Sequence, residues 1–360
     1  MPAAALAMLA CAAGCSDGAG MAPTITTTTR AGVAPVPPRQ GAYFGAWVPP
    51  SGETPASPSE SSESSRASSS PSDRSGAPQA PGASDVPSFR PLPGAVGEFE
   101  RELGRPLDIV QRYRGWKSDF PGRDDTALLD AGARYLLLTW AGADTREVVS
   151  GKHDRLIRAR ARAIKATGKP IFLRWQRDMD KESLRDRVHS AADFVAAWKH
   201  LRRIFEQERV DNVAWVWCPT AGGFGSRNAP SFYPGDDQVD WICVDAQPGG
   251  QYEYRDLSET LKLFLEWAED RPKPIMIAEF GVPRSYGTRR AEWLRKAAET
   301  LQDPQVKAVV YFNSDEQAQE ARDERRRYAV TGDRQAVSAL RELATLPYFN
   351  PRGLPVTSGG

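Results

Sequence analysis

The chain has few of the residues that metal centres and redox sites require. Its 360 residues include four cysteines and three histidines. The histidines lie in charged, helix-like stretches without a shared spacing, so we expect no metal and no cofactor. Cys218 and Cys243 lie in apolar stretches and also lack metal-site spacing. We expect two buried thiols, and a disulfide is the alternative if the protein is exported.

An excess of charge of either sign is also missing. The chain carries 47 basic and 46 acidic residues, which gives a formal net charge of +1. This balance produces no overall field that favours nucleic acid or an anionic membrane surface, and it leaves an uncharged substrate unopposed. We therefore expect no nucleic-acid partner, and we expect a monomer.

No apolar run is long enough to cross a bilayer, but the N-terminus is apolar and rich in small residues. Residues 1–15 end in Ala12-Ala13-Gly14-Cys15, which resembles a bacterial lipoprotein signal in which the cysteine receives lipid. This predicts an exported protein, either held at the cell surface through a lipid on Cys15 or extracellular. A disordered Ala-rich leader is the alternative.

Two further segments have almost no apolar side chains to bury. Residues 16–40 are rich in Thr, Pro and Gly and predict a disordered tether, and residues 49–93 form a Ser/Pro-rich low-complexity segment. A strand-like run at residues 43–48 separates the two. The second segment is therefore predicted to be an insertion in the first βα loop, where added length costs little entropy per residue.

From residue 94 onward, short apolar runs alternate with helix-like stretches. Eight strands are expected, at residues 43–48, 107–113, 134–140, 170–175, 212–219, 240–247, 274–278 and 306–312. Most of these runs are continuously apolar, as in buried parallel strands. The pattern predicts an α/β fold, a (β/α)8 TIM barrel over residues 41–348, followed by a tail at 349–360.

Two acidic residues follow the fourth and seventh predicted strands. Asp178 comes after residues 170–175, and Glu279 comes directly after residues 274–278. The carboxyl ends of barrel strands carry catalytic residues, and cleavage of a glycosidic bond needs one acid and one base or nucleophile. The pair predicts a glycoside hydrolase. For either residue alone, a solvated carboxylate at the rim is the alternative.

Other candidate residues lie near the ends of predicted strands. Arg174 is expected either to pair with a carboxylate at the barrel mouth or to form a structural salt bridge. Aromatic rings bind sugar faces through their apolar area, so aromatic residues near the mouth are predicted to contact substrate, with core packing as the alternative. These aromatic candidates are Trp47, Trp140, Trp175, Phe224 and Tyr233.

Five segments resemble glycoside hydrolase family 26, the family of β-mannanases and related endo-glucanases. They are residues 42–47 (AYFGAW), 172–180 (FLRWQRDMD), 215–219 (WVWCP), 233–241 (YPGDDQVDW) and 273–281 (KPIMIAEFG). The resemblance implies retaining hydrolysis of a β-linked, mannose-like polysaccharide without a cofactor. It also implies that Glu279 is the nucleophile and that Asp178 is the acid/base.

The sequence departs from the family pattern around the acid. Asp178 replaces a Glu, Arg177 stands where the family has His, and Asp180 stands where it has Asn. Gln247 occupies a position where the family usually has a Tyr that hydrogen-bonds the nucleophile. A carboxyl shorter by one methylene is withdrawn by about 1.5 Å, and a nearby Arg177 would favour the ionised, non-donating form. A catalytically silent barrel that binds carbohydrate is therefore the alternative function.

Overall fold

The computed structural model describes residues 24–27, 29–50, 92, 94–132, 134–226, 228–248, 254–315 and 324–357. The predicted signal segment with Cys15 lies outside these residues, as does almost all of the predicted insertion at 49–93. In the described part of the chain, no helix combines the length and the apolar character needed to span a membrane.

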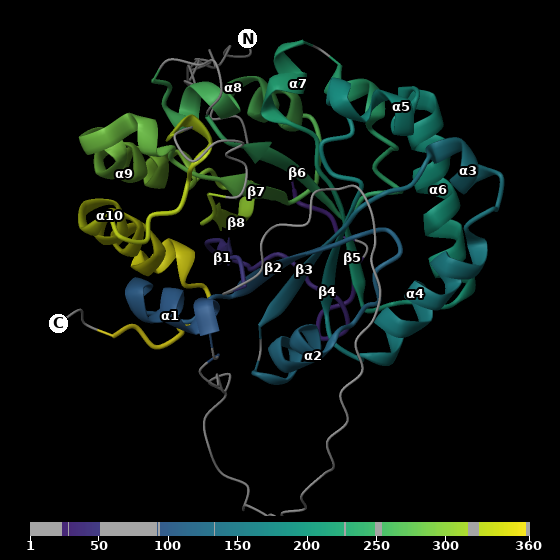
Figure 1. The fold of residues 1–360 in the computed structure, drawn as a ribbon, viewed down its shortest axis with the longest axis horizontal. Coiled ribbons are helices and arrows are strands. Elements are labelled where there is room, and N and C mark those ends of the chain that lie inside the picture. Colours follow the sequence, from purple (N-terminus) through teal and green to yellow (C-terminus); the bar gives the residue numbers. More distant parts are fainter. Residues whose placement is uncertain are drawn as a thin grey trace, which may run out of the picture.

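Eight parallel strands close into a barrel in the order of the sequence (Figure 1). The last strand pairs with the first and completes the ring. The strands are β1 Tyr43–Trp47, β2 Ile109–Arg114, β3 Tyr135–Trp140, β4 Ile171–Trp175, β5 Val213–Trp217, β6 Trp241–Ala246, β7 Ile275–Phe280 and β8 Val306–Phe312. The predicted (β/α)8 barrel is confirmed.

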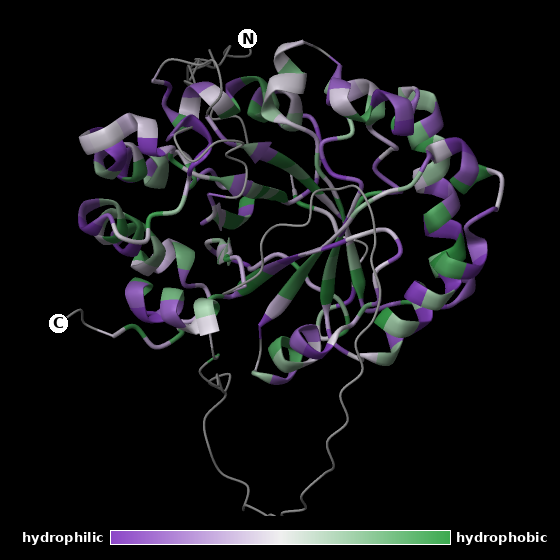
Figure 2. Cartoon of the chain, in the orientation of Figure 1, coloured by the Kyte–Doolittle hydropathy of each residue, from purple (hydrophilic) through white to green (hydrophobic). Residues whose placement is uncertain are grey.

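Helices surround the strands on the outside of the barrel (Figure 1). They are α1 Gly94–Leu103, α2 Arg123–Asp130, α3 Thr145–Val149, α4 Asp154–Ala166, α5 Arg185–Val188, α6 Ala191–Gln207, α7 Ala221–Gly225, α8 Leu257–Ala268, α9 Arg290–Thr300 and α10 Arg334–Thr345. Short 3-10 helices are η1 Glu182–Leu184, η2 Ala229–Phe232, η3 Arg284–Arg289, η4 Glu324–Arg326 and η5 Pro347–Phe349. The strands are largely apolar, while the helices carry polar residues on their outer faces (Figure 2).

Alternation along the strands divides the buried apolar side chains into two main layers. One layer lies between the strands and the helices. The other fills the barrel interior and consists of Tyr43, Ile109, Leu137, Phe172, Ala214, Val216, Cys218, Trp241, Cys243, Met276, Ala278, Ala308 and Val310. A strand residue can therefore reach the barrel mouth only if it shares the inward direction of this second layer.

Cys218 and Cys243 form a disulfide inside the barrel, with their Cα atoms 4.4 Å apart. The expectation of two free thiols is wrong. Cys243 lies on β6 and Cys218 directly follows the neighbouring strand β5, and both side chains face the interior. Adjacent strands bring two inward-facing cysteines within the separation that a disulfide needs.

Residues 24–40, as far as they are described, pack against the barrel. The backbone N–H of Thr26 donates to the carbonyl of Pro272 at 2.7 Å, and the Tyr43 hydroxyl donates to the carbonyl of Val36 at 3.1 Å. Ala34 is buried. The prediction of a disordered tether is wrong for this part, because backbone hydrogen bonds and small apolar side chains hold a segment whose composition alone predicts disorder.

The amino-terminal end of the barrel is closed by charged and aromatic side chains. Arg105 Nη2 lies 2.7 Å from Asp108 Oδ2, and both side chains are fully buried. The guanidinium of Arg352, in the predicted tail, lies over the rings of Tyr43 and Tyr135 at 4.8 and 4.1 Å. This end of a barrel serves stability, so the chemistry belongs at the opposite end of the strands.

Candidate active site

Glu279 lies within β7 and its side chain points into the barrel mouth. The sequence predicted that it lies just past the strand. The pairing of β7 with β8 shifts between Ile277 and Phe280, and the pairing of β6 with β7 shifts between Val244 and Asp245. An irregularity of this kind redirects side chains. Glu279 therefore faces inward, although the preceding Ala278 also belongs to the interior layer.

Four side chains donate hydrogen bonds to the carboxylate of Glu279. Oε1 accepts from Gln111 Nε2 at 3.1 Å, from Arg174 Nη2 at 2.5 Å and from the Tyr113 hydroxyl. Oε2 accepts from Gln247 Nε2 at 3.1 Å. The carboxylate is thus fixed in orientation, with three donors on one oxygen and one donor on the other.

Charge keeps Glu279 ionised despite its burial. Burial alone would raise the pKa of Glu279, but the charges of Arg177 and Arg174 outweigh it and lower that pKa. Arg174 is itself fully buried, and its Nη1 lies 2.7 Å from Asp245 Oδ1. Arg174 therefore pairs with two carboxylates at the mouth. An ionised, oriented carboxylate is what a nucleophile requires.

Asp178 follows β4 in a tight turn. Gln176 and Asp178 have φ values of +47° and +56°, which are unusual for residues other than glycine and cost about 1–3 kcal/mol each. The backbone N–H of Asp178 donates to the carbonyl of Cys218 at 3.0 Å, which fixes the turn against the end of β5. Because the chain has left the strand, Arg177 and Asp178 no longer face opposite sides, and their side chains meet.

Two cations share one oxygen of Asp178. Oδ2 accepts a hydrogen bond from Arg177 Nη1, and Lys181 Nζ donates to it at 2.7 Å. Oδ1 is buried and has no hydrogen-bond partner among the residues that the structure describes. Burial alone would raise the pKa of Asp178, but Arg177 and Lys181 lower that pKa to about 2. At neutral pH this carboxylate therefore accepts protons more readily than it donates them.

Arg177 contacts both candidate catalytic carboxylates. Its Nη1 donates to Asp178, and its Nε lies 3.7 Å from Glu279 Oε1. The structure thus brings the ends of β4 and β7 to a single guanidinium. Asp178 and Glu279 thus belong to one cluster of charged side chains at the carboxyl ends of the strands.

Besides Lys181, three residues of this cluster were missed in the sequence. Gln111 and Tyr113 lie two and four residues after Ile109 on strand β2, so alternation along the strand places both on the same inward face as Ile109. Asp245 interrupts the apolar strand β6. Burial and the nearby charges of Glu279 and Asp178 raise the pKa of Asp245 well above its usual value, although Arg174 opposes them.

Trp140 and Trp175 face away from the mouth. Trp175 is fully buried against Phe194, with ring centroids 5.5 Å apart, and Trp140 stacks on Trp116 at 4.5 Å. Both belong to the layer between strands and helices. The prediction that they contact sugar is wrong for both. Each directly follows an inward-facing residue, so alternation turns its ring outward.

Of the other aromatic candidates, Phe224 is a core residue. It is buried and packs on Phe264 of α8 at 5.2 Å, so the prediction of a subsite wall is wrong. Tyr233 is half-buried, packs on Trp217 at 5.0 Å and donates its hydroxyl to Asp236. Its contact with substrate stays a prediction.

Trp47 faces the mouth at the end of β1. Its ring packs edge-on against Tyr113 at 4.8 Å, and Tyr113 donates to Glu279. Within the described part of the chain, the buried indole Nε1 of Trp47 has no hydrogen-bond partner. Trp47 lies next to Tyr113, which donates to Glu279, and its contact with substrate stays a prediction.

Cys218, Cys243 and Asp245 have potential ligand atoms within 4.8 Å of one another. The two sulfurs are bonded to each other and offer no thiolate, and Asp245 already pairs with Arg174. The donor set therefore does not fit a metal ion.

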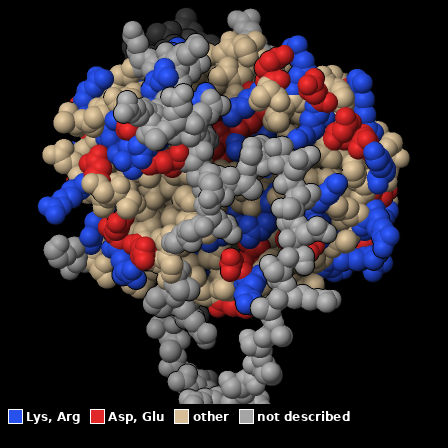
Figure 3. Space-filling model, viewed as in Figure 1, with Lys and Arg blue, Asp and Glu red and all other residues tan. Residues whose placement is uncertain are grey.

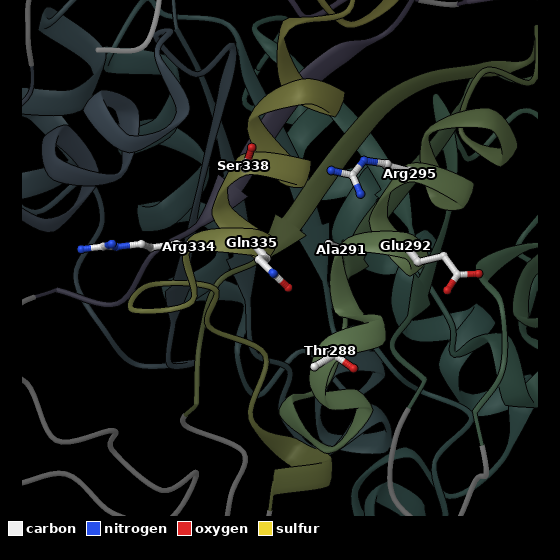
Figure 4. A pocket seen from close by; sticks show the side chains of 7 residues that line it. All are labelled: Thr288, Ala291, Glu292, Arg295, Arg334, Gln335 and Ser338. Atoms are coloured by element: carbon white, nitrogen blue, oxygen red, sulfur yellow. The ribbon is translucent and has the colours of Figure 1, made fainter.

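A separate groove lies on the outer helical layer between α9 and α10 (Figure 4). It has a volume of about 400 Å³ and is lined by Thr288, Ala291, Glu292, Arg295, Arg334, Gln335 and Ser338. None of these residues lies on a strand. The groove is therefore distinct from the cleft that contains Asp178 and Glu279.

The fold and this cluster together define a class of protein: a (β/α)8 barrel with two carboxylates at the carboxyl ends of β4 and β7.

No family model matches the chain. In sequence, it is 26% identical over 284 residues to Endoglucanase H of Acetivibrio thermocellus, a match covering 73% of this chain and 30% of that protein. It is also 26% identical over 171 residues to the β-1,3-xylanase TXYA of a Vibrio species, covering 44% and 35%. The chain thus spans about a third of the length of the curated relatives it matches.

Among solved structures, the chain resembles a GH26 β-mannanase from Bacteroides ovatus. The TM-score is 0.55 and the identity is 12%, over 86% of this chain and 90% of that one. The predicted resemblance to glycoside hydrolase family 26 is confirmed.

Proposed function

We propose that the chain is a glycoside hydrolase that cleaves a β-linked polysaccharide, such as mannan, with retention of anomeric configuration. The observation that carries this proposal is the ionised carboxylate of Glu279, oriented by Arg174 and Tyr113 inside the barrel mouth. The proteins similar to this chain are an endoglucanase, a β-1,3-xylanase and a β-mannanase, which supports a polysaccharide substrate.

The hydrogen bonds assign the oxygens of the first step. Oε2 of Glu279 accepts one hydrogen bond and Oε1 accepts three, so Oε2 has the electron pair for attack. Oε2 forms a bond to the anomeric carbon as the bond to the leaving oxygen breaks. Asp178 gives a proton to that oxygen from Oδ1, the atom without a partner in the described chain.

The second step reverses the roles. A water attacks the anomeric carbon, its proton passes to Asp178, and Glu279 leaves as a carboxylate. The ionised state of Asp178 suits this step, because it already has the form of a base. The same state hinders the first step whenever the leaving oxygen needs a proton.

This hindrance favours a second candidate function, a barrel that binds polysaccharide without cleaving it. Arg177 and Lys181 together keep Asp178 ionised. Asp178 then lacks the proton that must be donated when an ordinary glycosidic bond is cleaved. The cleft, the ionised Glu279 and Trp47 would all remain available for binding. Substrates whose leaving group departs without a proton separate the two functions.

We expect Asp178→Asn to slow mannan hydrolysis by about 100-fold, because proton transfer is lost in both steps. The burst of dinitrophenolate from a 2,4-dinitrophenyl β-mannoside should persist, since that leaving group needs no acid. Reducing-end assays and stopped-flow absorbance measure the two rates. Asp119→Asn, at an exposed aspartate paired with Arg160, is the matched control. A wild-type protein that binds mannan but releases neither reducing ends nor dinitrophenolate is the silent barrel.

The rate of mannan cleavage should rise on acidification from about pH 7 to about pH 4. The proton donor is the protonated form of Asp178, whose pKa of about 2 lies below this range. Its protonated fraction therefore grows about tenfold for each unit by which the pH falls. The pKa of Glu279 is also lowered, which keeps more of the nucleophile ionised as the pH falls. Profiles of kcat/KM for mannan and for the aryl mannoside test this, and a mannan optimum above neutrality would assign the proton to another group.

A further inference from the structure

The cations that hold the two catalytic carboxylates reach solvent, whereas the carboxylates do not. The side chains of Arg177 and Lys181 are 28% and 49% exposed, while those of Asp178 and Glu279 are 4% and 1% exposed. Arg177 and Lys181 therefore form the solvent-facing side of the charged cluster that contains Asp178 and Glu279. An arriving substrate meets positive charge before it meets either acid.

The protein surface as a whole shows no excess of positive charge. Basic and acidic side chains are interspersed over the face seen in Figure 3. Three cations, Arg174, Arg177 and Lys181, face the carboxylates of Asp178, Asp245 and Glu279. A fourth carboxylate, Asp180, accepts hydrogen bonds from Thr220 and is close enough for the charge of Asp178 to act on it. Because burial raises the pKa of Asp245 well above its usual value, the negative side of this balance is weakened. The solvent-facing side of this cluster, where Arg177 and Lys181 lie, is thus suited to an anion although the chain is nearly neutral.

A neutral sugar offers nothing to replace Asp178 on its two cations. A ligand anion would compete with Asp178 for Arg177 and Lys181, because the side chains of both cations are partly exposed to solvent. Loss of these cations and the arrival of a negative charge both act to raise the pKa of Asp178. Asp178 would then carry a proton when such a ligand is bound, and this is when the first step needs it.

The position of the anion follows from the chemistry. The acid/base carboxyl must reach the leaving oxygen, so the side chains gathered on Asp178 lie on the leaving side of the bond that is cut. Lys181 contacts Asp178, and Arg177 contacts both Asp178 and Glu279. A guanidinium fits a carboxylate well and forms charge-assisted hydrogen bonds with it.

We propose that the cleft takes an acidic polysaccharide, in which Arg177 and Lys181 bind the carboxylate of a uronic-acid residue on the leaving side of the scissile bond. This inference rests on the proposed glycoside hydrolase function and specifies its substrate class. The substrate carboxylate displaces Asp178 from its cations, and Asp178 takes up a proton that the buffered solvent supplies. That proton then passes to the leaving oxygen as the glycosidic bond breaks.

The test compares two β-1,4-linked tetrasaccharides that differ only at C6, one built of glucose and one of glucuronate. Binding is measured by calorimetry to the Glu279→Gln variant, which cannot turn them over. If that variant fails to fold, sulfur-linked analogues are used with the wild-type protein. The glucuronate ligand should bind about tenfold tighter, through added charge-assisted hydrogen bonds. This preference should shrink as salt rises.

Two variants and a measurement of proton uptake identify the residues that cause the preference for glucuronate. Lys181→Met should remove most of the preference, while Lys152→Met, at an exposed lysine paired with Glu147, should leave it unchanged. Calorimetry in buffers of different ionisation enthalpy should detect proton uptake when glucuronate binds, and Asp178→Asn should abolish that uptake. Equal affinity for the two ligands, or a preference that survives in Lys181→Met, overturns the inference. Tighter binding of a 6-O-sulfated glucose tetrasaccharide than of glucuronate overturns the assignment to a carboxylate.

These results are separate from those that judge the proposed function. Hydrolysis of neutral mannan with no preference for glucuronate would reject the acidic substrate and keep the hydrolase. A glucuronate preference with proton uptake, but without release of reducing ends from any polysaccharide, would keep the acidic ligand and reject the hydrolase.

Discussion

Replacement of Glu279 by Ala is expected to lower glycoside cleavage by about 10⁴-fold or more, on polysaccharide and on aryl glycoside alike. Among the described residues, no other carboxylate near Glu279 is free to take its place. Asp178 is engaged by Arg177 and Lys181, and Asp245 is paired with Arg174. The loss should be equal for the two substrates because both need a bond to the anomeric carbon, whatever the leaving group. Initial rates of reducing-end and dinitrophenolate release measure it.

Glu292→Ala provides the matched control. Glu292 is an exposed glutamate in the groove between α9 and α10, paired with Lys296 and outside the cleft. This variant should keep wild-type rates. If Glu279→Ala cleaved the aryl mannoside as fast as the Glu292 variant does, Glu279 would not be the nucleophile.

Replacement of Arg174 by Met should lower the free energy of unfolding by about 3–5 kcal/mol, because it leaves buried carboxylates without their partner. Arg174 is completely buried and pairs with both Asp245 and Glu279. Methionine fills similar space, so the loss reflects charge more than packing. Urea unfolding followed by circular dichroism at pH 7 measures the change.

The pH dependence of this loss identifies its cause. Without Arg174, the pKa of each buried carboxylate rises, so at lower pH the groups become neutral and the variant recovers part of its stability. Arg162→Met is the control, since Arg162 is exposed and its pair with Glu208 contributes little. A loss below about 1 kcal/mol, or one that does not change with pH, would show that Arg174 does not stabilise these carboxylates.

The barrel could be predicted from the sequence because its strands are short apolar runs separated by amphipathic helices. β8 was predicted with the bounds it has in the structure, and the other strands lie within a few residues of their predicted positions. The direction in which each strand side chain points was harder to predict. Trp140 and Trp175 were assigned to the mouth by their position at strand ends, yet each lies one residue beyond an inward-facing Thr139 or Arg174, so its ring joins the outer layer.

The site depends on backbone features that residue types do not reveal. The pairing shift in β7 turns Glu279 inward, and the positive φ values at Gln176 and Asp178 bring Arg177 onto the acid. Nothing in the local composition predicts either feature. By contrast, Gln111 and Tyr113 could have been found, because polar residues two apart on a buried strand face the same side.

The central claim is that Glu279 forms a covalent bond to the sugar. A 2,4-dinitrophenyl 2-deoxy-2-fluoro-β-mannoside tests it directly, because the fluorine slows release of the intermediate and the leaving group needs no proton from Asp178. Mass spectrometry of the digested protein should find one fluorosugar on the peptide that contains Glu279, and none in Glu279→Ala. A label on Asp178 or Asp245, or steady turnover of the mannoside with no covalent label, would contradict the account.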